Sequence, residues 1–274
     1  MSSAGERARQ HYGRGGLLGR IEAALRANGD PVEKFAVEAL YPLDQLHSRQ
    51  LNATKEHAAR LRLDESKHVL DVGSGIGGPA RYMATTFGCH VTGIDLTEEF
   101  VAVARELTRR CGLSARVTFE LGDAMAMPFA DQSFDACSCL HVAMNIADKR
   151  RLLGETSRVL RRGARLVWSI VVAGIGEPHY PVPWARASDG SFLVSPASLR
   201  AAFADAGLAV VEWNDETKTN LDHAAAMRAA GRPAPGNLTN QIVLGDDFSD
   251  AVANLRRNLT EGRLRVLFIL AERT

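Results

Sequence analysis

The sequence has few cysteines, no long apolar run and no excess of charge of either sign. Four cysteines are too few for a disulfide scaffold in a chain of 274 residues. The longest apolar run, residues 166–176, is interrupted by Ser169 and is far too short to span a membrane. The first ten residues are polar and charged, so we expect no signal peptide and a cytoplasmic protein.

Basic and acidic residues almost balance. The 33 Lys and Arg residues against 32 Asp and Glu residues leave a formal net charge of +1, which lacks the electrostatic footprint of a dedicated nucleic-acid binder. Hydrophobic residues make up 46% of the chain and charged residues 24%, as in ordinary globular proteins. We therefore expect a folded chain without a nucleic-acid partner or a membrane span, working as a monomer or a homodimer.

The first stretch, residues 1–66, is predicted to be helical. Apolar residues at helical spacing mark one face of residues 17–25. Pro31 predicts the first position of a second helix, which Pro42 would end. Residues 52–63 predict a third helix. Because no segment here has the pattern of a strand, we expect a helical N-terminal cap.

The second stretch, residues 67–172, alternates between short apolar runs and helical segments. The predicted strands are residues 68–72, 90–94, 117–121, 134–140 and 165–172, and the predicted helices are residues 79–87, 98–110 and 149–160. This alternation is typical of βαβ units. It predicts an α/β fold with a mostly parallel sheet and helices on both faces.

The last stretch begins with a loop rich in glycine and proline and adds two late strands. Helices are predicted at residues 196–206, 222–230 and 247–259, and strands at residues 208–213 and 264–272. We expect residues 67–274 to form one domain. Within it, the helices of about residues 217–262 are predicted to form a lid insertion.

Four glycines follow the first predicted strand within the segment DVGSGIGG, residues 71–78. Glycines permit a tight turn and a close approach of the backbone to a ligand, and the next helix presents unpaired N–H groups. The pattern predicts a cofactor site at the carboxyl edge of the sheet. The spacing fits both GxGxxG and GxGxG, and Asp95 can accept the ribose hydroxyls of any adenosine. The glycine loop and Asp95 therefore do not distinguish a nicotinamide cofactor from S-adenosylmethionine.

Two further carboxylates favour S-adenosylmethionine. Asp71 lies two residues before the first glycine, where it would face an ammonium group and repel a pyrophosphate. Asp123 follows the third predicted strand, where it can accept a hydrogen bond from an adenine amino group.

On these segments the sequence resembles the class I S-adenosylmethionine-dependent methyltransferases. The resemblance is carried, in the family's order and spacing, by VLDVGSGIGGPARYMA, VTGIDLT, FELGDAMAMPFADQSFDACSCLHVAMNIADK and RVLRRGARLVWS. It implies a Rossmann-like sheet of seven strands, with residues 264–272 antiparallel, and S-adenosylmethionine as the cofactor. The cofactor-binding residues that it implies are Asp71, Gly73, Gly75, Gly77, Asp95, Leu96, Asp123, Ala124 and His141.

Within the family, DQLHSRQLNATKEHAARL and GIGGPARY resemble the small-molecule methyltransferases of the sarcosine/dimethylglycine, phosphoethanolamine and sugar-tailoring type. Nucleic-acid adenine-amino methyltransferases carry an Asn/Asp-Pro-Pro-aromatic tetrad after the fourth strand, where this sequence has CSCLHVA. One departure, Arg162-Gly163 in place of Pro-Gly-Gly, falls in a turn. The resemblance implies methyl transfer to an N or O nucleophile of a small-molecule acceptor.

His141 follows the fourth predicted strand, at the edge that faces the cofactor in this fold. An imidazole with an unperturbed pKa near ~6.5 can take a proton from an acceptor hydroxyl or amine. We therefore predict that His141 is the catalytic base. The alternative is a histidine that only packs against the cofactor.

Five residues are candidates for contact with the acceptor: His47, Asn145, His179, Tyr180 and Trp184. Asn145 can instead cap the helix that follows it. The two aromatic residues would suit a cationic acceptor. The histidines lie on separate segments without metal-ligand spacing, so we expect no metal site. A nicotinamide-dependent oxidoreductase and a non-catalytic S-adenosylmethionine-binding protein are the alternative functions.

Overall fold

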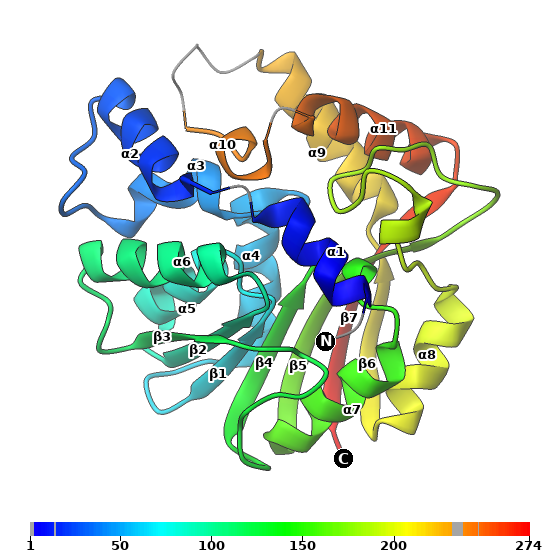
Figure 1. The fold of residues 1–274 in the computed structure, drawn as a ribbon. Helices are drawn as coiled ribbons and strands as arrows, with labels where there is room; N and C mark the ends of the chain where they lie inside the picture. Colours follow the sequence, from blue (N-terminus) through cyan, green and yellow to red (C-terminus); the bar gives the residue numbers. More distant parts are fainter. Residues whose placement is uncertain (1–2, 14, 232–237, 246) are drawn as a thin grey trace.

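Seven strands form a single sheet in the order β3-β2-β1-β4-β5-β7-β6 (Figure 1). The computed structural model describes residues 3–13, 15–231, 238–245 and 247–274. The strands are β1 (His68–Val72), β2 (His90–Asp95), β3 (Val117–Leu121), β4 (Phe134–Leu140), β5 (Leu160–Ala173), β6 (Leu208–Asp215) and β7 (Leu264–Arg273). Strand β7 pairs antiparallel with both β5 and β6, whereas the pairs from β3 to β5 are parallel. The predicted sheet and its antiparallel strand are confirmed.

Helices precede, connect and follow the strands. They are α1 (Ser3–Tyr12), α2 (Leu17–Asn28), α3 (Tyr41–Asp44), α4 (Gln50–Ala58), α5 (Gly78–Phe87), α6 (Glu98–Arg110), α7 (Lys149–Val159), α8 (Pro196–Asp205), α9 (Thr217–Ala229), α10 (Gln241–Leu244) and α11 (Phe248–Thr260). Short 3-10 turns lie at Val37–Leu40, Ala59–Leu61, Ala143–Asn145 and Ser188–Gly190.

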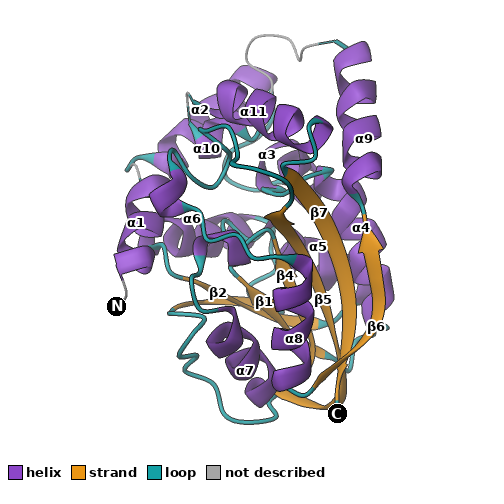
Figure 2. Ribbon diagram, turned by 90° about the vertical axis from the view of Figure 1, so that its right-hand side faces the viewer, coloured by secondary structure: helices purple, strands orange, loops and turns teal. Residues whose placement is uncertain are grey.

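Helices cover both faces of the sheet, and the side chains along each strand alternate between the two faces. Val69 and its neighbours on one face pack with α4, α5 and α6. Leu70 and Trp168 point to the other face and pack with α7 and α8, which lie together on one side of the sheet in Figure 2. The result is a three-layer α/β arrangement whose central strands are apolar on both sides.

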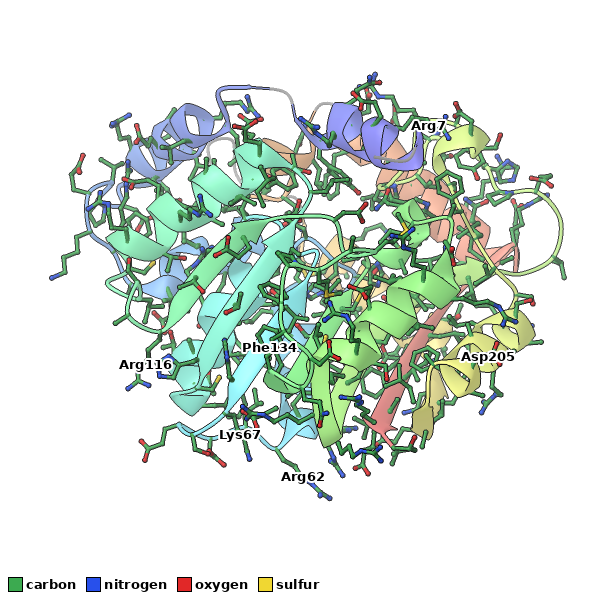
Figure 3. The ribbon with its side chains drawn as sticks, turned by 60° about the horizontal axis from the view of Figure 1, so that its bottom comes forward. Arg7, Arg62, Lys67, Arg116, Phe134 and Asp205 are labelled. Carbon is green, nitrogen blue, oxygen red and sulfur yellow. The ribbon has the colours of Figure 1, made fainter. Side chains whose placement is uncertain are left out.

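The amino ends and the carboxyl ends of the strands have different surroundings. Phe134, at the start of β4, is buried in the interior, whereas Arg62, Arg116 and Asp205 point outward near the amino ends of strands (Figure 3). The carboxyl ends of the parallel strands face the helical cap instead (Figure 1). In open α/β sheets this carboxyl edge is where ligands bind.

Helix α6 is held between the sheet and the N-terminal cap. Its Val101 packs toward the sheet, while Phe100 and Leu107 belong to a separate apolar cluster with α2 and α10. The predicted apolar face of α2 is confirmed, since Leu17 and Ile21 are both buried in this cluster. The cap is therefore fixed to the helix that follows β2.

The prediction of a helix beginning at Pro31 is wrong. The backbone there is tied to the end of α6: Phe35 N donates to Arg110 O at 3.4 Å, and the Arg110 guanidinium donates to Val32 O at 2.8 Å. These bonds hold residues 30–36 in a non-helical path. Pro42 does not end a helix either, because it lies in the first turn of α3, where its missing N–H costs nothing.

The predicted lid segment contains α9, α10 and α11. Helix α9 begins at Thr217, five residues before the predicted start, and it packs with α11 and β7. The predicted loop between these helices falls largely on residues 232–237, outside the described residues. Within the described ranges, no helix has both the length and the apolar character needed to cross a membrane.

Candidate functional site

A cavity of about 1290 Å³, counting its open mouth, lies at the carboxyl edge of β1, β2 and β4. The loop between β1 and α5 lines its floor. Gly73 and Gly75 line the cavity and have φ of 67° and 53°, a region that other residues rarely adopt. A Cβ at Gly73 would also come within 2.3 Å of the Val142 side chain. The backbone of both glycines therefore forms part of the cavity wall.

Gly77 departs from its predicted role. It does not line the cavity, and a Cβ there would come within 2.5 Å of Phe119 and 2.8 Å of Arg81. With φ of 87°, Gly77 is the residue immediately before α5. Packing at the start of this helix therefore requires a glycine at position 77.

Asp71 lines the cavity and has an unsatisfied carboxylate oxygen. The residue is 2% exposed; the Ser138 hydroxyl donates to Oδ1, and Oδ2 has no hydrogen-bond partner among the described residues. Burial raises the pKa of Asp71 to about 7, the Ser138 hydrogen bond opposes the rise, and the charge of Asp95 adds to it. A buried oxygen without a donor suits a cationic hydrogen-bond donor from a ligand.

Two further carboxylates lie at the ends of β2 and β3. Asp95 accepts backbone N–H groups from Gly75 at 2.9 Å and Thr97 at 2.8 Å, and burial raises its pKa. Asp123 accepts the backbone N–H of Met125 at 2.8 Å. These bonds fix both carboxylates at the cavity wall, which also includes Leu96 and Ala124. Both retain lone pairs for a ligand.

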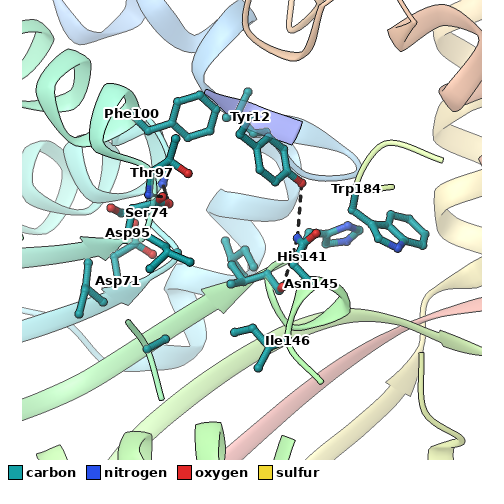
Figure 4. A pocket seen from close by; sticks show the side chains of 18 of the residues that line it. Tyr12, Asp71, Ser74, Asp95, Thr97, Phe100, His141, Asn145, Ile146 and Trp184 are labelled. Carbon is teal, nitrogen blue, oxygen red and sulfur yellow. Dashed lines mark hydrogen bonds between the residues drawn. The ribbon is translucent and has the colours of Figure 1, made fainter. Parts of the chain in front are cut away.

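His141 turns its imidazole into the cavity, where it lies between Asn145 and Trp184 (Figure 4). Its backbone N–H donates to Ser169 O at 2.8 Å and its φ is 57°, so the chain leaves β4 in a left-handed turn. No described residue hydrogen-bonds to either ring nitrogen. Burial, followed by the neighbouring His47 and His57, lowers the pKa of His141 to about 3. The expected value near ~6.5 is therefore corrected, and the ring is neutral at physiological pH.

His47 lies beside His141, with ring centroids 6.3 Å apart. Its Nε2 is 3.0 Å from Thr54 Oγ1 and its Nδ1 is 3.2 Å from Ser48 O. Burial lowers the pKa of His47 to about 4. His47 thus lines the cavity, as the sequence predicted, but both ring nitrogens have protein partners.

Asn145 and Trp184 also line the cavity. Asn145 Nδ2 donates to Tyr12 Oη at 3.4 Å (Figure 4), and Trp184 Nε1 donates to Ser191 Oγ at 2.9 Å. Asn145 does not cap α7. That cap is Asp148, whose carboxylate accepts a backbone N–H of the first turn at 2.9 Å.

His179 and Tyr180 do not line the cavity. His179 is bound to α11: its backbone N–H donates to Asn258 Oδ1 at 2.8 Å, and its Nε2 is 2.9 Å from Glu261 Oε2. Tyr180 packs against the apolar cluster between the sheet and α8. The loop after β5 therefore brings only its later residues to the site.

The lining residues that were not predicted from the sequence include Tyr12, Leu46, Thr97, Met144 and Ile146. Tyr12 directly precedes the glycine-rich segment GRGG, a signal of a chain reversal that was not used. The others are neighbours in sequence of residues that were predicted. Among the described residues, no group of three His, Cys, Asp or Glu residues is arranged to hold a metal ion.

Comparisons with known proteins agree with this geometry. A family model described as a methyltransferase domain matches residues 70–168. The chain is 35% identical over 192 residues to the O-methyltransferase cnsE of Penicillium expansum, covering 69% of each protein. It is 38% identical over 133 residues to the methyltransferase GfsG of Streptomyces halstedii, covering 48% of each, so the match spans about half the length of that relative.

A solved structure shows the same fold. It is the geranyl diphosphate C-methyltransferase from Streptomyces coelicolor A3(2), in complex with Mg²⁺, geranyl-S-thiolodiphosphate and S-adenosyl-L-homocysteine. The TM-score is 0.74 at 17% identity, over 100% of this chain and 99% of that one. At this identity the likeness concerns the fold.

Proposed function

Because this chain belongs to the S-adenosylmethionine-dependent methyltransferases, we propose that it methylates an N or O nucleophile of a small-molecule acceptor, with His141 as the base. S-adenosylmethionine is the cofactor. When bound, it supplies an electrophilic methyl group: the acceptor's lone pair bonds to the methyl carbon, and the C–S electron pair stays on sulfur, giving S-adenosylhomocysteine.

The cofactor half of the cavity fits this group. We assign the unpartnered Oδ2 of Asp71 to the ammonium of the methionine moiety, in the part of the cavity that the backbone of Gly73 and Gly75 lines. Asp95 would accept the ribose hydroxyls, and Asp123 the adenine amino group. A nicotinamide cofactor fits poorly, since its pyrophosphate would lie against Asp71.

The observation that carries the role of His141 is its position. The imidazole lines the same cavity as Asp71, Asp95 and Asp123, and it lies between Asn145 and Trp184 (Figure 4). Its ring nitrogens have no hydrogen-bond partner among the described residues, and its lowered pKa keeps it neutral. A neutral imidazole can accept the acceptor's proton as the methyl group is transferred and release it to solvent through the mouth of the cavity.

Replacing His141 by alanine tests this role. We expect His141→Ala to lower kcat by roughly 10²- to 10⁴-fold, with the affinity for S-adenosylhomocysteine changed less than about twofold. His179→Ala is the matched control, because this histidine is bound to α11 outside the cavity, and it should retain full activity. Near-normal kcat with weakened cofactor binding in His141→Ala would instead make His141 a packing residue.

A further inference from the structure

Four carboxylates line the cavity among the described residues, and one of them, Asp44, is already paired with Arg81 at 2.9 Å. Asp71, Asp95 and Asp123 lie around the glycine loop and the ends of β2 and β3. We give the name acceptor half to the part lined by residues 141, 142 and 144–146 with Leu46, His47, Pro183 and Trp184. None of these described lining residues carries a charge at neutral pH, because burial lowers the pKa of both histidines.

Several polar groups of the acceptor half are bonded within the protein. Trp184 Nε1 is bound to Ser191, so Trp184 has no other donor for a ligand. The nitrogens of His47 are taken by Thr54 and Ser48, and the Asn145 amide nitrogen contacts Tyr12 Oη. His141 is therefore the imidazole in this half that is available to an acceptor.

The buried arginines near the cavity are already paired. Arg81 donates to Asp44 at 2.9 Å with both side chains fully buried, and Arg49 pairs with Glu56 and Glu216. These contacts leave them unsuited to neutralise an acceptor carboxylate or phosphate. Arg7 and Arg186 line a neighbouring hollow that shares Asn145 and Trp184 with the cavity. Arg186 pairs with Asp247, and the Arg7 guanidinium lies 5.9 Å from the centroid of the Phe192 ring.

We propose that the acceptor is an uncharged, mainly apolar molecule whose reacting group is a hydroxyl that hydrogen-bonds to His141. This inference rests on the proposed methyl transfer and specifies its substrate class. An acceptor with a carboxylate, phosphate or ammonium group would have to bury that charge in the acceptor half without a counter-charge, which is strongly unfavourable. A single hydroxyl matches the single available imidazole.

The chemistry of proton removal also favours a hydroxyl over an ammonium group. An ammonium with a pKa near ~10 must lose its proton before it has a lone pair. Because burial lowers the pKa of His141, its imidazole is a poor acceptor for that proton. A hydroxyl oxygen already has a lone pair, and its proton becomes strongly acidic as the O–C bond forms. The O–H bond then breaks toward a ring nitrogen of His141, and the proton passes on to solvent.

Four probes on one apolar skeleton test the inference: 2-naphthol, 2-naphthylmethylamine, 2-naphthoic acid and 2-naphthyl phosphate. Binding to the protein saturated with S-adenosylhomocysteine is measured by calorimetry, and transfer by S-adenosylhomocysteine formation. We expect 2-naphthol to bind at least about 100-fold more tightly than each charged probe, in line with several kcal/mol for an unpaired buried charge, and to be methylated on oxygen. 4-Phenylphenol serves as a second neutral probe.

The outcomes separate this inference from the proposed function. Preferred binding or methylation of a charged probe would overturn the inference and leave methyl transfer intact, as would failure of both neutral probes to bind. Binding of a neutral probe without transfer would support the inference and count against catalysis. Tight binding of 2-naphthyl phosphate that Arg7→Ala abolishes would place the anion in the neighbouring hollow and also overturn it.

A charge placed in the wall gives a second test. Ile146 lies in the acceptor half and is only partly buried, so a lysine there can reach the cavity. Ile146→Lys should bind 2-naphthyl phosphate at least roughly tenfold more tightly than the wild type, whereas the matched control Ile146→Met should not. Unchanged affinity for S-adenosylhomocysteine shows that both variants are folded. Equal binding of the phosphate by all three proteins would contradict the assignment of this wall to the acceptor.

Discussion

The clearest quantitative test concerns the charge of Asp71. Asp71→Asn keeps the shape of the side chain and an acceptor for the Ser138 hydroxyl, but it removes the negative charge that we assign to the cofactor's ammonium group. Loss of a hydrogen bond to a charged group costs about 1.5–3 kcal/mol. This corresponds to roughly 10- to 150-fold weaker binding of S-adenosylmethionine.

The pH dependence of binding is a more specific consequence. The pKa of Asp71 is raised to about 7 by burial, with the Ser138 hydroxyl lowering it and Asp95 raising it. The neighbouring thiols of Cys137 and Cys139 stay neutral, since burial raises their pKa values as well. Below pH 7 the carboxyl is protonated and must lose its proton before it can pair with an ammonium. Wild-type affinity should therefore fall roughly 80-fold between pH 7.5 and pH 5.

Titration calorimetry over this pH range measures the effect. S-adenosylmethionine is compared with 5′-methylthioadenosine, which lacks the amino group, and Asp71→Asn is compared with the wild type. Only the wild type with S-adenosylmethionine should show the pH dependence and release protons on binding at pH 7. Constant wild-type affinity from pH 5 to 7.5, or the same profile with 5′-methylthioadenosine, would refute the pairing of Asp71 with the ammonium.

Three other predictions follow from the site and its supports. Asp95→Ala should weaken S-adenosylmethionine binding by roughly 10- to 150-fold through lost ribose hydrogen bonds; unchanged affinity by calorimetry would contradict the assignment. Arg81→Met leaves the fully buried Asp44 without its cationic partner, with Gln45 Nε2 as the remaining side-chain donor, and should lower the free energy of unfolding by about 3–5 kcal/mol; a loss below about 1 kcal/mol in urea titrations would argue against this reasoning. Because the pKa of His141 is lowered to about 3, its basic form is present at all higher pH, so wild-type kcat should show no histidine limb between pH 5 and 8. A rise in wild-type kcat near pH ~6.5 that disappears in His141→Ala would contradict the lowered pKa of His141.

The elements of the sheet were predictable because their signals are local. Residues 68–72, 117–121 and 134–140 are short apolar runs bounded by turn residues, and the observed strands have these same bounds. The glycine loop and the carboxylates at the ends of β1, β2 and β3 were also visible, since the order of strands in a βαβ pattern places their carboxyl ends at one edge.

The expectations that the structure does not meet concern residues whose conformation or pKa depends on contacts between distant segments. Pro31 has a good helix-start signal, but hydrogen bonds to Arg110 decide the conformation around it. His179 lies in the loop that follows the carboxyl end of β5, where a site residue is expected, but Asn258 and Glu261 hold it against α11. The lowered pKa of His141 has the same origin, because it depends on burial and on histidines from the N-terminal cap.

The position of β7 has a consequence for how the chain acquires its structure. This strand is the last in chain order, but it lies between β5 and β6 and is the strand with which β6 pairs. While the chain is being synthesised, β5 has an unpaired edge and β6 has no place in the sheet until residues 264–273 emerge. Exposed strand edges promote association between chains. The nascent protein should therefore be most prone to aggregate immediately before its final strand is added.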